Sequence, residues 1–530
     1  MGLSLKVPYR KENKMENNTK TPFYKNRRFK YGSLAVALTV IFIALIIVLN
    51  AVVYALTYTN GWYIDLSGQQ NFGITKASTD ELDNVLTDNT QIQIIFCQPK
   101  DKVLADSAGY YVYKCAESYK KAYPNNINLV FVDIVKHPEV ANEYLVKHGE
   151  TLTPDNVIIE SKSVDKAQQQ EGYVYDNVRV VNYTSFFVFD EDSGGVYAFK
   201  GELSFTSHLI SLCHGSPICY FTTGNGETIS ASDSSGNTFN SALAELFMDA
   251  GFIVKKIDLD DANASLNDAK VVVMNDPKWD ITQTEKDVLS QFMSDGRGNM
   301  MVFLSPESMA KKESEELKNL KVFLKEWGIE VEGGPVSDLS NSLAASNGLA
   351  VVADYPTTGF ASSLHKHIRE NVGTVPKTVI NSPLAFNCVW NNNANGTKEL
   401  GWLLHSYATA ELGDYKNEMF DIAAVVRNIF LDSATAREFE SYMLVTSTGF
   451  VDADYLRSNA YGNRDIILSL AAEMAKVLVV KDIEYTVFAN EELTITTEEA
   501  YTWTVVLVAV IPVVVLGIGG AVCFVRRRRS

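Results

Sequence analysis

Two long uncharged runs constrain this chain more than any other feature of its sequence. Residues 32–57 contain no charged side chain, and neither do residues 501–525. A helix needs about 20 apolar residues to cross the hydrocarbon core of a bilayer, so each run is long enough for one span. Pro512 and the glycines that follow it are tolerated better in membrane helices than elsewhere. The two runs therefore predict transmembrane helices at 32–57 and 501–525.

The basic residues beside these runs predict their orientation. Residues 1–31 form a basic tail, and four arginines lie in the final segment, 526–530. Positive residues next to a span remain cytoplasmic, so both termini are expected in the cytoplasm of a two-pass protein of the cell membrane. Residues 58–500 are then extracytoplasmic, and membrane lipid is an expected contact. A cleaved signal peptide is the alternative for the first run, but its apolar stretch would be only about 7–15 residues long.

Charge and cysteine content exclude some classes of partner and chemistry. The formal net charge is −17, although both ends of the chain are basic. An acidic surface repels phosphate, which excludes nucleic acid as a partner. The six cysteines include no Cys-x-x-Cys pair and no zinc-binding spacing. Cys213 and Cys219 either form a disulfide bond or are free, and the sequence leaves both alternatives open.

The region after a connector at 58–90 predicts a first α/β domain at 91–212. A capping box at 78–81 predicts a short helix through Leu86. Hydrophobic patterns then predict alternating strands and helices, a β-hairpin and a closing helix, which is the order of a thioredoxin-like domain. The expected strands are 91–97, 127–134, 156–160, 185–190 and 196–200, and the expected helices are 107–122, 138–148 and 202–212. A redox pair would follow the first strand, where only Cys97 is present, so dithiol exchange is excluded.

A second α/β domain is predicted at 213–490, with an irregular insertion around 335–400 and a connector at 491–500. The strand patterns end in polar loops, and ligands bind at the carboxyl ends of parallel strands. The expected strands begin near 217 and lie at 252–259, 270–276 and 299–306, with helices at 238–250 and after a capping box at Thr282 and Glu285. The candidate ligand or partner loop comprises Thr223, Gly224, Asn225, Gly226, Glu227 and Asp276.

The sequence offers no strong catalytic motif for this candidate loop. It contains no G-x-x-x-x-G-K-[ST], G-x-S-x-G or H-E-x-x-H string. Glu227 is a single carboxylate without a placed partner, which is a weak basis for acid–base catalysis. His365 and His367 alternate as strand ligands do, but on a helix they would diverge. No catalytic residue, metal site or cofactor is therefore predicted.

Several motifs in a fixed order resemble the GldG-like auxiliary proteins of ABC transport systems, a family named after gliding motility. The order of these motifs is more specific than any one of them, and together they cover nearly all of the region between the two runs and the second run itself. They are YIDLSGQQNFGITKASTDELDNVL, GELSFTSHLISL, YFTTGNGE, VVVMNDPKWDITQTEKDVLSQFMSDGRGNMMVFLSP, VTSTGFVDADYLRSNAYGNRDIILSLAAEMA and the closing LTITTEEAYTW run.

The resemblance implies more than the residue patterns alone. It implies a thioredoxin-like domain followed by a domain with a class I glutamine-amidotransferase-like, flavodoxin-like fold. It also implies partnership with a separate ATPase and a permease. Asn225 stands where the family usually has histidine, and Arg297 interrupts the usual Gly-Gly pair. Both departures weaken any chemistry proposed for the loop.

Three functions are compatible with these observations. The leading hypothesis is a non-enzymatic auxiliary subunit of an ABC-type transport system that contacts an unknown extracellular substrate. The second is a membrane-anchored hydrolase or transferase, in which Thr222 or Thr223 acts with Glu227. The third is a surface binding module that acts alone.

Overall fold

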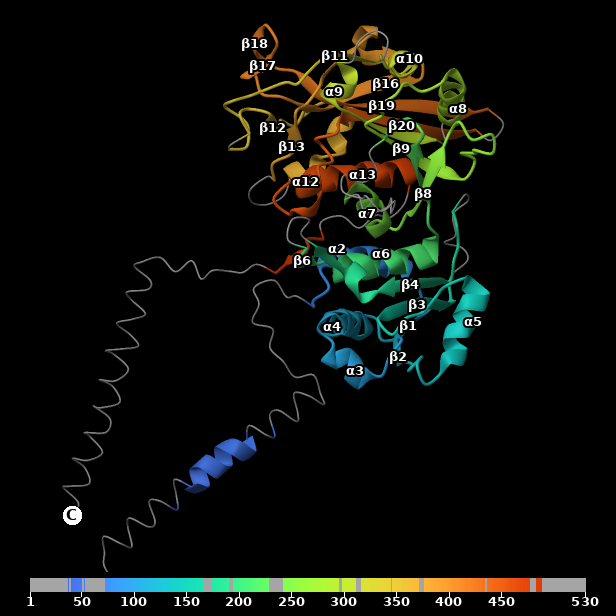
Figure 1. Ribbon diagram of the computed structural model, residues 1–530, viewed down its shortest axis with the longest axis vertical. Helices are drawn as coiled ribbons and strands as arrows, with labels where there is room; N and C mark the ends of the chain where they lie inside the picture. The colour runs from blue at the N-terminus through green and yellow to red at the C-terminus, as the bar shows by residue number, and fades with distance from the viewer. Residues whose placement is uncertain are drawn as a thin grey trace, which may run out of the picture. The chain divides into compact units, whose positions relative to one another are not determined.

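The computed structural model divides the chain into two units, residues 1–70 and 71–530 (Figure 1). Each unit is described by itself. The structure describes Ala37, 40–49, Val52, 72–164, 173–189, 194–227, 242–294, 298–310, 316–344, 346–370, 376–433, 436–476 and 483–488.

The prediction of two transmembrane helices is wrong for the part of the chain that can be tested. None of the helices formed by the described residues combines the length and the apolar character that a bilayer crossing requires. In the first run the structure describes Ala37, 40–49 and Val52. The second run, 501–525, lies outside the described residues. The two-pass localisation, with residues 58–500 extracytoplasmic, depended on these spans and is corrected with them.

A four-stranded sheet organises the first half of the unit at 71–530. Its strand order is β2-β1-β3-β4, in which β1 and β2 are parallel and the other pairs are antiparallel. The strands are β1 (Gln91–Phe96), β2 (Ile127–Phe131), β3 (Asn156–Ser163) and β4 (Val178–Asn182). The helices are α2 (Lys76–Val85), α3 (Lys100–Ala105), α4 (Ser107–Ala122), α5 (Pro138–His148) and α6 (Gly201–His214).

Side-chain alternation along β1 gives this sheet two hydrophobic faces. Ile94 and Phe96 belong to the core formed with α2, α4 and α6, whereas Ile95 points into a smaller core with α5. This alternation is the period of two that a strand imposes on its side chains. The names and boundaries of the predicted domains stay predictions.

The hairpin predicted at 185–200 forms, but it belongs to another sheet. A 3-10 turn, η3 (Tyr183–Phe186), leads into β5 (Phe187–Phe189), which pairs with β6 (Val196–Phe199). On its other side β6 pairs with β21 (Thr486–Val487), so the order is β21-β6-β5. The fourth strand of the larger sheet is β4, which the sequence analysis missed. The hairpin is thus extended beside α6 by a strand from the end of the described chain.

An eight-stranded sheet organises the second half of the unit. Its order is β15-β16-β19-β20-β10-β9-β7-β8, parallel from β20 to β8 and antiparallel from β15 to β20. The strands are β7 (Ile218–Thr223), β8 (Ile253–Asp258), β9 (Ala269–Asn275), β10 (Asn299–Leu304), β15 (Ala394–Asn395), β16 (Lys398–His405), β19 (Asp421–Asp432) and β20 (Arg437–Ser447).

Helices cover both faces of this sheet, as Figure 1 shows. Val271 and Val273 of β9 pack with α7 (Ala242–Asp249) and α13 (Asn463–Ala475), whereas Val272 packs with α8 (Gln283–Ser294) and α10 (Lys318–Glu326). Coverage on both faces explains the continuous apolar run in β9. The mixed α/β class that the sequence predicted is therefore present.

Short elements complete the described part of this half. They are mostly two-stranded pairs in and near the region predicted to be irregular: β11 (Ile329–Gly333) with β14 (Ala385–Cys388), β12 (Ala350–Val352) with β13 (Val379–Asn381), and β17 (Ala410–Leu412) with β18 (Tyr415–Glu418). The remaining short helices and turns are α9 (Pro306–Met309), α11 (Lys366–Arg369), α12 (Ala453–Arg457), η4 (Phe360–Ser363) and η5 (Asn391–Asn393).

The two predicted capping boxes have different outcomes. At α8 the prediction is confirmed, because Thr282 N donates to Glu285 Oε2 at 2.7 Å and Glu285 N donates to Thr282 Oγ1 at 3.2 Å. At α2 the predicted start is wrong, because the helix begins at Lys76 after Thr75. There the first turn is bonded by a distant residue, Glu202 of α6. Glu202 Oε1 accepts hydrogen bonds from Thr75 N at 2.6 Å, Thr75 Oγ1 at 2.7 Å and Ser78 Oγ at 2.6 Å.

These bonds predict a stability role for Glu202. Glu202→Ala removes one acceptor from three donors, of which Ser78 is fully buried. We expect the free energy of unfolding to fall by about 1–3 kcal/mol, measured by urea unfolding of the full chain. Glu332→Ala, at an exposed position in β11, is the control and should change it by less than about 0.5 kcal/mol. Equal effects of the two substitutions would contradict the role assigned to Glu202.

Candidate functional site

The predicted loop follows β7 and makes a tight turn that requires glycine at two positions. Gly224 and Gly226 have φ of 112° and 72°, values that side chains of L-residues rarely allow. A Cβ at Gly224 would lie 2.8 Å from Asp258 Oδ1, and one at Gly226 would lie 3.0 Å from the Trp279 ring. The backbone therefore approaches its neighbours closely on both sides of Asn225.

Asn225 holds this loop against two other segments. Its side chain is buried, and its Nδ2 donates to Glu285 Oε1 of α8 at 2.7 Å. Its carbonyl oxygen accepts from Lys278 N at 2.7 Å and from Trp279 N at 3.0 Å. The loop after β7 is thus fixed to the loop after β9 and to α8.

Asp276 follows β9 in a left-handed conformation, with φ of 55°. Its Oδ1 accepts from Ser305 Oγ at 2.6 Å and from Ser308 Oγ at 2.8 Å, and its Oδ2 forms an ion pair with Lys278. The six predicted residues are therefore brought together at the carboxyl ends of β7 and β9. Since β8 and β9 lie on opposite sides of β7, this edge is a topological switch point, where open α/β sheets bind ligands.

The two threonines considered as nucleophiles differ in their surroundings. Thr223 Oγ1 donates to Ile257 O at 3.2 Å, away from Glu227. Thr222 is buried, at 2% exposure; its Oγ1 donates to Val273 O at 3.5 Å, and Thr222 also lowers the pKa of Glu227 through a hydrogen bond. Burial raises the pKa of Glu227, and hydrogen bonds from Asn225 N and Thr222 only partly oppose this shift. The structure thus brings Thr222, but not Thr223, to the carboxylate.

Other predicted features have simple structural positions. Cys213 and Cys219 are both free and buried, so they do not form a disulfide bond. His365 is fully buried, and its Nδ1 accepts from Arg369 Nε at 3.0 Å. The side chain of His367 lies outside the described residues. Among the residues that the structure describes, no group of three or more His, Cys, Asp or Glu side chains could hold a metal ion.

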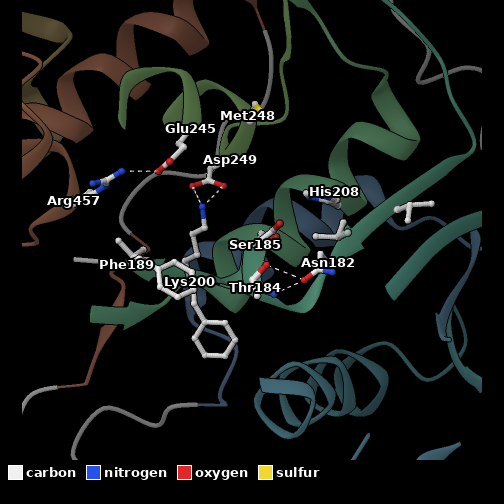
Figure 2. A pocket seen from close by; sticks show the side chains of 15 residues that line it. Asn182, Thr184, Ser185, Phe189, Lys200, His208, Glu245, Met248, Asp249 and Arg457 are labelled. Atoms are coloured by element: carbon white, nitrogen blue, oxygen red, sulfur yellow. Dashed lines mark hydrogen bonds and ion pairs between the residues drawn. The ribbon is translucent and has the colours of Figure 1, made fainter. Parts of the chain in front are cut away.

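A cavity of about 460 Å³ lies between α6, α7 and the strands β4 and β5 (Figure 2). Its volume falls within the usual range for small-molecule pockets, about 300–1,000 Å³. The cavity is lined by apolar side chains and by side chains that can form hydrogen bonds. The residues are Val180, Val181, Asn182, Thr184, Ser185, Phe187, Val188, Phe189, Lys200, Ser204, His208, Glu245, Met248, Asp249 and Arg457.

Two ion pairs line this cavity, as Figure 2 shows. Lys200 Nζ, from the β6–α6 junction, donates to Asp249 Oδ1 at 2.8 Å and to Oδ2 at 2.7 Å. Arg457 of α12 contacts Glu245 Oε2 of α7 at 3.2 Å. Burial would lower the pKa of Lys200, but Asp249 and other acidic groups outweigh it and raise the pKa. Burial raises the pKa of Glu245, although Arg457 and Lys200 oppose the shift.

His208 supplies an uncharged imidazole to the same cavity. Burial, together with the positive charges of Arg179 and Lys200, lowers the pKa of His208 to about 4. The ring is therefore neutral at physiological pH. The neutral imidazole of His208 thus lies in the same cavity as the two ion pairs.

Sequence reasoning missed this cavity because its partners are distant along the chain. Glu245 and Arg457 are 212 positions apart, and Lys200 and Asp249 are 49 apart. A motif with a fixed short spacing in the sequence cannot reveal contacts between residues this far apart. The one available signal was Lys200, which lies at the end of a predicted strand and directly precedes the GELSFTSHLISL motif.

The comparisons with known proteins support a transport-related family. Residues 217–351 match a family model described as an ABC-type uncharacterized transport system. The match covers less than half of the chain and supports the ABC auxiliary family and an auxiliary, transport-related role; it does not separate GldG-like proteins from other members. No curated protein matches the chain.

Two solved structures have weak similarity to the chain. The mmIFT52 N-terminal domain aligns with a TM-score of 0.36 and 14% identity, over 50% of this chain and 99% of its own. A ThuA-like protein from Bacteroides uniformis ATCC 8492 aligns with a TM-score of 0.26 and 12% identity, over 49% of this chain and 92% of its own. Both scores are too low to carry an argument.

The neutral state of His208 predicts a pH dependence of stability. An unfolded histidine titrates near 6.5, so the unfolded chain binds a proton that folded His208 accepts only near pH 4. Its contribution to stability is therefore complete above about pH 6.5 and is lost as the pH falls toward 4. We expect the unfolding free energy of the wild type to fall over this window by about 1–3 kcal/mol more than that of His208→Gln. Urea unfolding at a series of pH values measures the difference.

The matched control replaces a histidine outside the cavity. His137 precedes α5 and its side chain is 60% exposed. We expect the pH profile of His137→Gln to follow the wild type. If His208→Gln also follows the wild type, the imidazole is not held neutral by the cavity.

Proposed function

We propose that this chain is a non-enzymatic auxiliary subunit of an ABC-type transport system that contacts the transported solute. A separate ATPase supplies the energy and a separate permease supplies the pathway. The observation that carries the proposal is the match of residues 217–351 to the ABC-type transport family. The sequence also lacks a G-x-x-x-x-G-K-[ST] string, which supports an ATPase on another chain.

The matched segment contains the candidate loop and one part of the cavity lining. It includes the loop after β7 with Asn225, and also α7, whose Glu245 and Asp249 line the cavity. The loop is held in place by hydrogen bonds to α8 and to the loop after β9. A loop held in this way suits a docking role, whereas the cavity suits a small solute.

Trp279 is the residue of this region best placed to contact a partner protein. It packs over Gly226 beside the candidate loop and is 64% exposed. Large exposed aromatic side chains are frequent anchors of protein interfaces. We assign Trp279 to the contact with the permease or the ATPase.

The burial of Thr222 favours this proposal over the hydrolase alternative. A nucleophile must reach its substrate, but Thr222 is 2% exposed at the end of a central strand. The contact with Glu227 is accounted for by the structure of the loop. The alternative of a binding module that acts alone is separated from the proposal by the experiment below.

The proposal predicts a stable association that depends on Trp279. Affinity purification of the tagged full chain from its native source should recover an ATPase and a permease in comparable amounts, identified by mass spectrometry. Trp279→Ser should reduce their recovery about tenfold or more, as expected for the loss of an interface anchor. Val322→Ser, at a position in α10 that is 49% exposed, is the matched control and should recover both. Purification of the wild-type chain without either partner would refute the proposal.

A further inference from the structure

The charges that line the cavity form a compact and balanced set. Lys200 pairs with Asp249 at 2.7 Å and Arg457 pairs with Glu245 at 3.2 Å, while Glu245 also raises the pKa of Lys200 and Lys200 opposes the rise in the pKa of Glu245. Two cations and two carboxylates thus lie within mutual range, and the fifth titratable side chain in the lining, His208, is neutral. The Lys200–Asp249 pair is largely removed from solvent, with side chains 9% and 13% exposed, whereas Arg457 and Glu245 are 17% and 35% exposed. The cavity therefore carries ion pairs without carrying net charge.

This balance restricts the charge of a ligand. Ion pairs withdrawn from water stabilise a fold weakly, because desolvation offsets their attraction. A ligand with a net charge would leave one buried charge uncompensated, which is costly. A ligand with one positive and one negative group can exchange partners with the two pairs and keep every charge compensated. We infer that the cavity binds a small zwitterionic solute that carries an ammonium group and a carboxylate.

The positions of the four side chains assign a role to each. Lys200 and Arg457 are the donors for the carboxylate of the solute, and Asp249 and Glu245 are the acceptors for its ammonium group. Ser204 and Asn182 offer uncharged hydrogen-bonding groups for the body of the solute, and Phe189 and Met248 offer apolar surface. A volume of about 460 Å³ accommodates a dipeptide-sized molecule.

The inference names the solute class for the proposed transport role and rests on that proposal for its biological meaning. The binding itself requires neither the ATPase nor the permease. It is therefore measured on the purified full chain alone, and its failure is distinguishable from a failure to recover partners.

Calorimetric titration with three related probes tests the charge requirement. Glycyl-L-leucine at pH 7.0 is zwitterionic, N-acetylglycyl-L-leucine has only the carboxylate, and glycyl-L-leucinamide has only the ammonium group. We expect the dipeptide to bind about tenfold or more tightly than either capped form, because each cap removes one charge-assisted contact. Glucose, a neutral polyol, should not compete. Equal affinity for a capped form or for glucose would overturn the inference, as would the absence of dipeptide binding.

Glu245→Gln tests whether the binding occurs in this cavity. The substitution removes one carboxylate and leaves a net positive charge, so the affinity for the dipeptide should fall about tenfold. The ratio of the affinities for glycyl-L-leucine and N-acetylglycyl-L-leucine should also fall, because the variant has lost one acceptor for the ammonium group. Glu399→Gln is the matched control, because Glu399 also pairs with an arginine, Arg427, at 2.9 Å outside the cavity. Identical titrations of the two variants would overturn the assignment.

A second variant keeps the inference testable if Glu245→Gln fails to fold. Met248 is 38% exposed at the rim of the cavity, and Met248→Trp fills space without changing any charge. We expect this variant to lose dipeptide binding while its thermal unfolding midpoint stays close to that of the wild type. Undiminished binding by a folded Met248→Trp would place the dipeptide elsewhere and refute the inference.

Discussion

The ion pair between Lys200 and Asp249 is the contact on which the arrangement of the folded unit depends. Lys200 lies at the end of β6, between the small three-stranded sheet and α6, and Asp249 ends α7 of the eight-stranded half. The ammonium group of Lys200 donates hydrogen bonds to both carboxylate oxygens of Asp249. Two residues further along, Glu202 holds the start of α2, and β6 itself pairs with β21. Segments from the beginning, middle and end of the described unit therefore meet at one junction.

The energetics of such a junction favour a role in specificity. Replacing a buried ion pair by apolar residues is often neutral or stabilising, whereas removing one partner leaves an uncompensated charge and is costly. A packing of α6 and α7 that separated Lys200 from Asp249 would therefore leave both charges uncompensated. A ligand that supplies substitute charges can loosen this contact without leaving either charge unpaired. Because desolvation offsets the attraction between Lys200 and Asp249, the pair stabilises the fold little, and a solute can replace one of its partners at low cost.

Sequence reasoning succeeded where the determinants are local. Helix α4 has the predicted bounds, 107–122, and the capping box of Thr282 and Glu285 forms as expected. It failed where a distant residue decides the outcome, because α2 begins at Lys76 with Glu202 bonding its first turn. The apolar run at 32–57 met a length criterion for a span, but no helix of the described residues is long and apolar enough to cross a membrane. The candidate loop was predicted because the hydrophobic pattern of the sequence shows where strands end. The cavity was missed, since its charged residues come from segments that are distant in the sequence.

The two candidate surfaces differ in what their polar groups can still do. At the carboxyl ends of β7 and β9, Asn225 and Asp276 bond to Glu285, Ser305 and Ser308, so a ligand there would have to replace existing hydrogen bonds of good geometry. In the cavity, the charged groups are paired across separate elements, and the space beside them is open. A loop held in place, with an exposed tryptophan beside it, suits a constant partner, and an exchangeable set of charges suits a solute that enters and leaves. β7 links the two, because it begins just after α6 and ends at the loop.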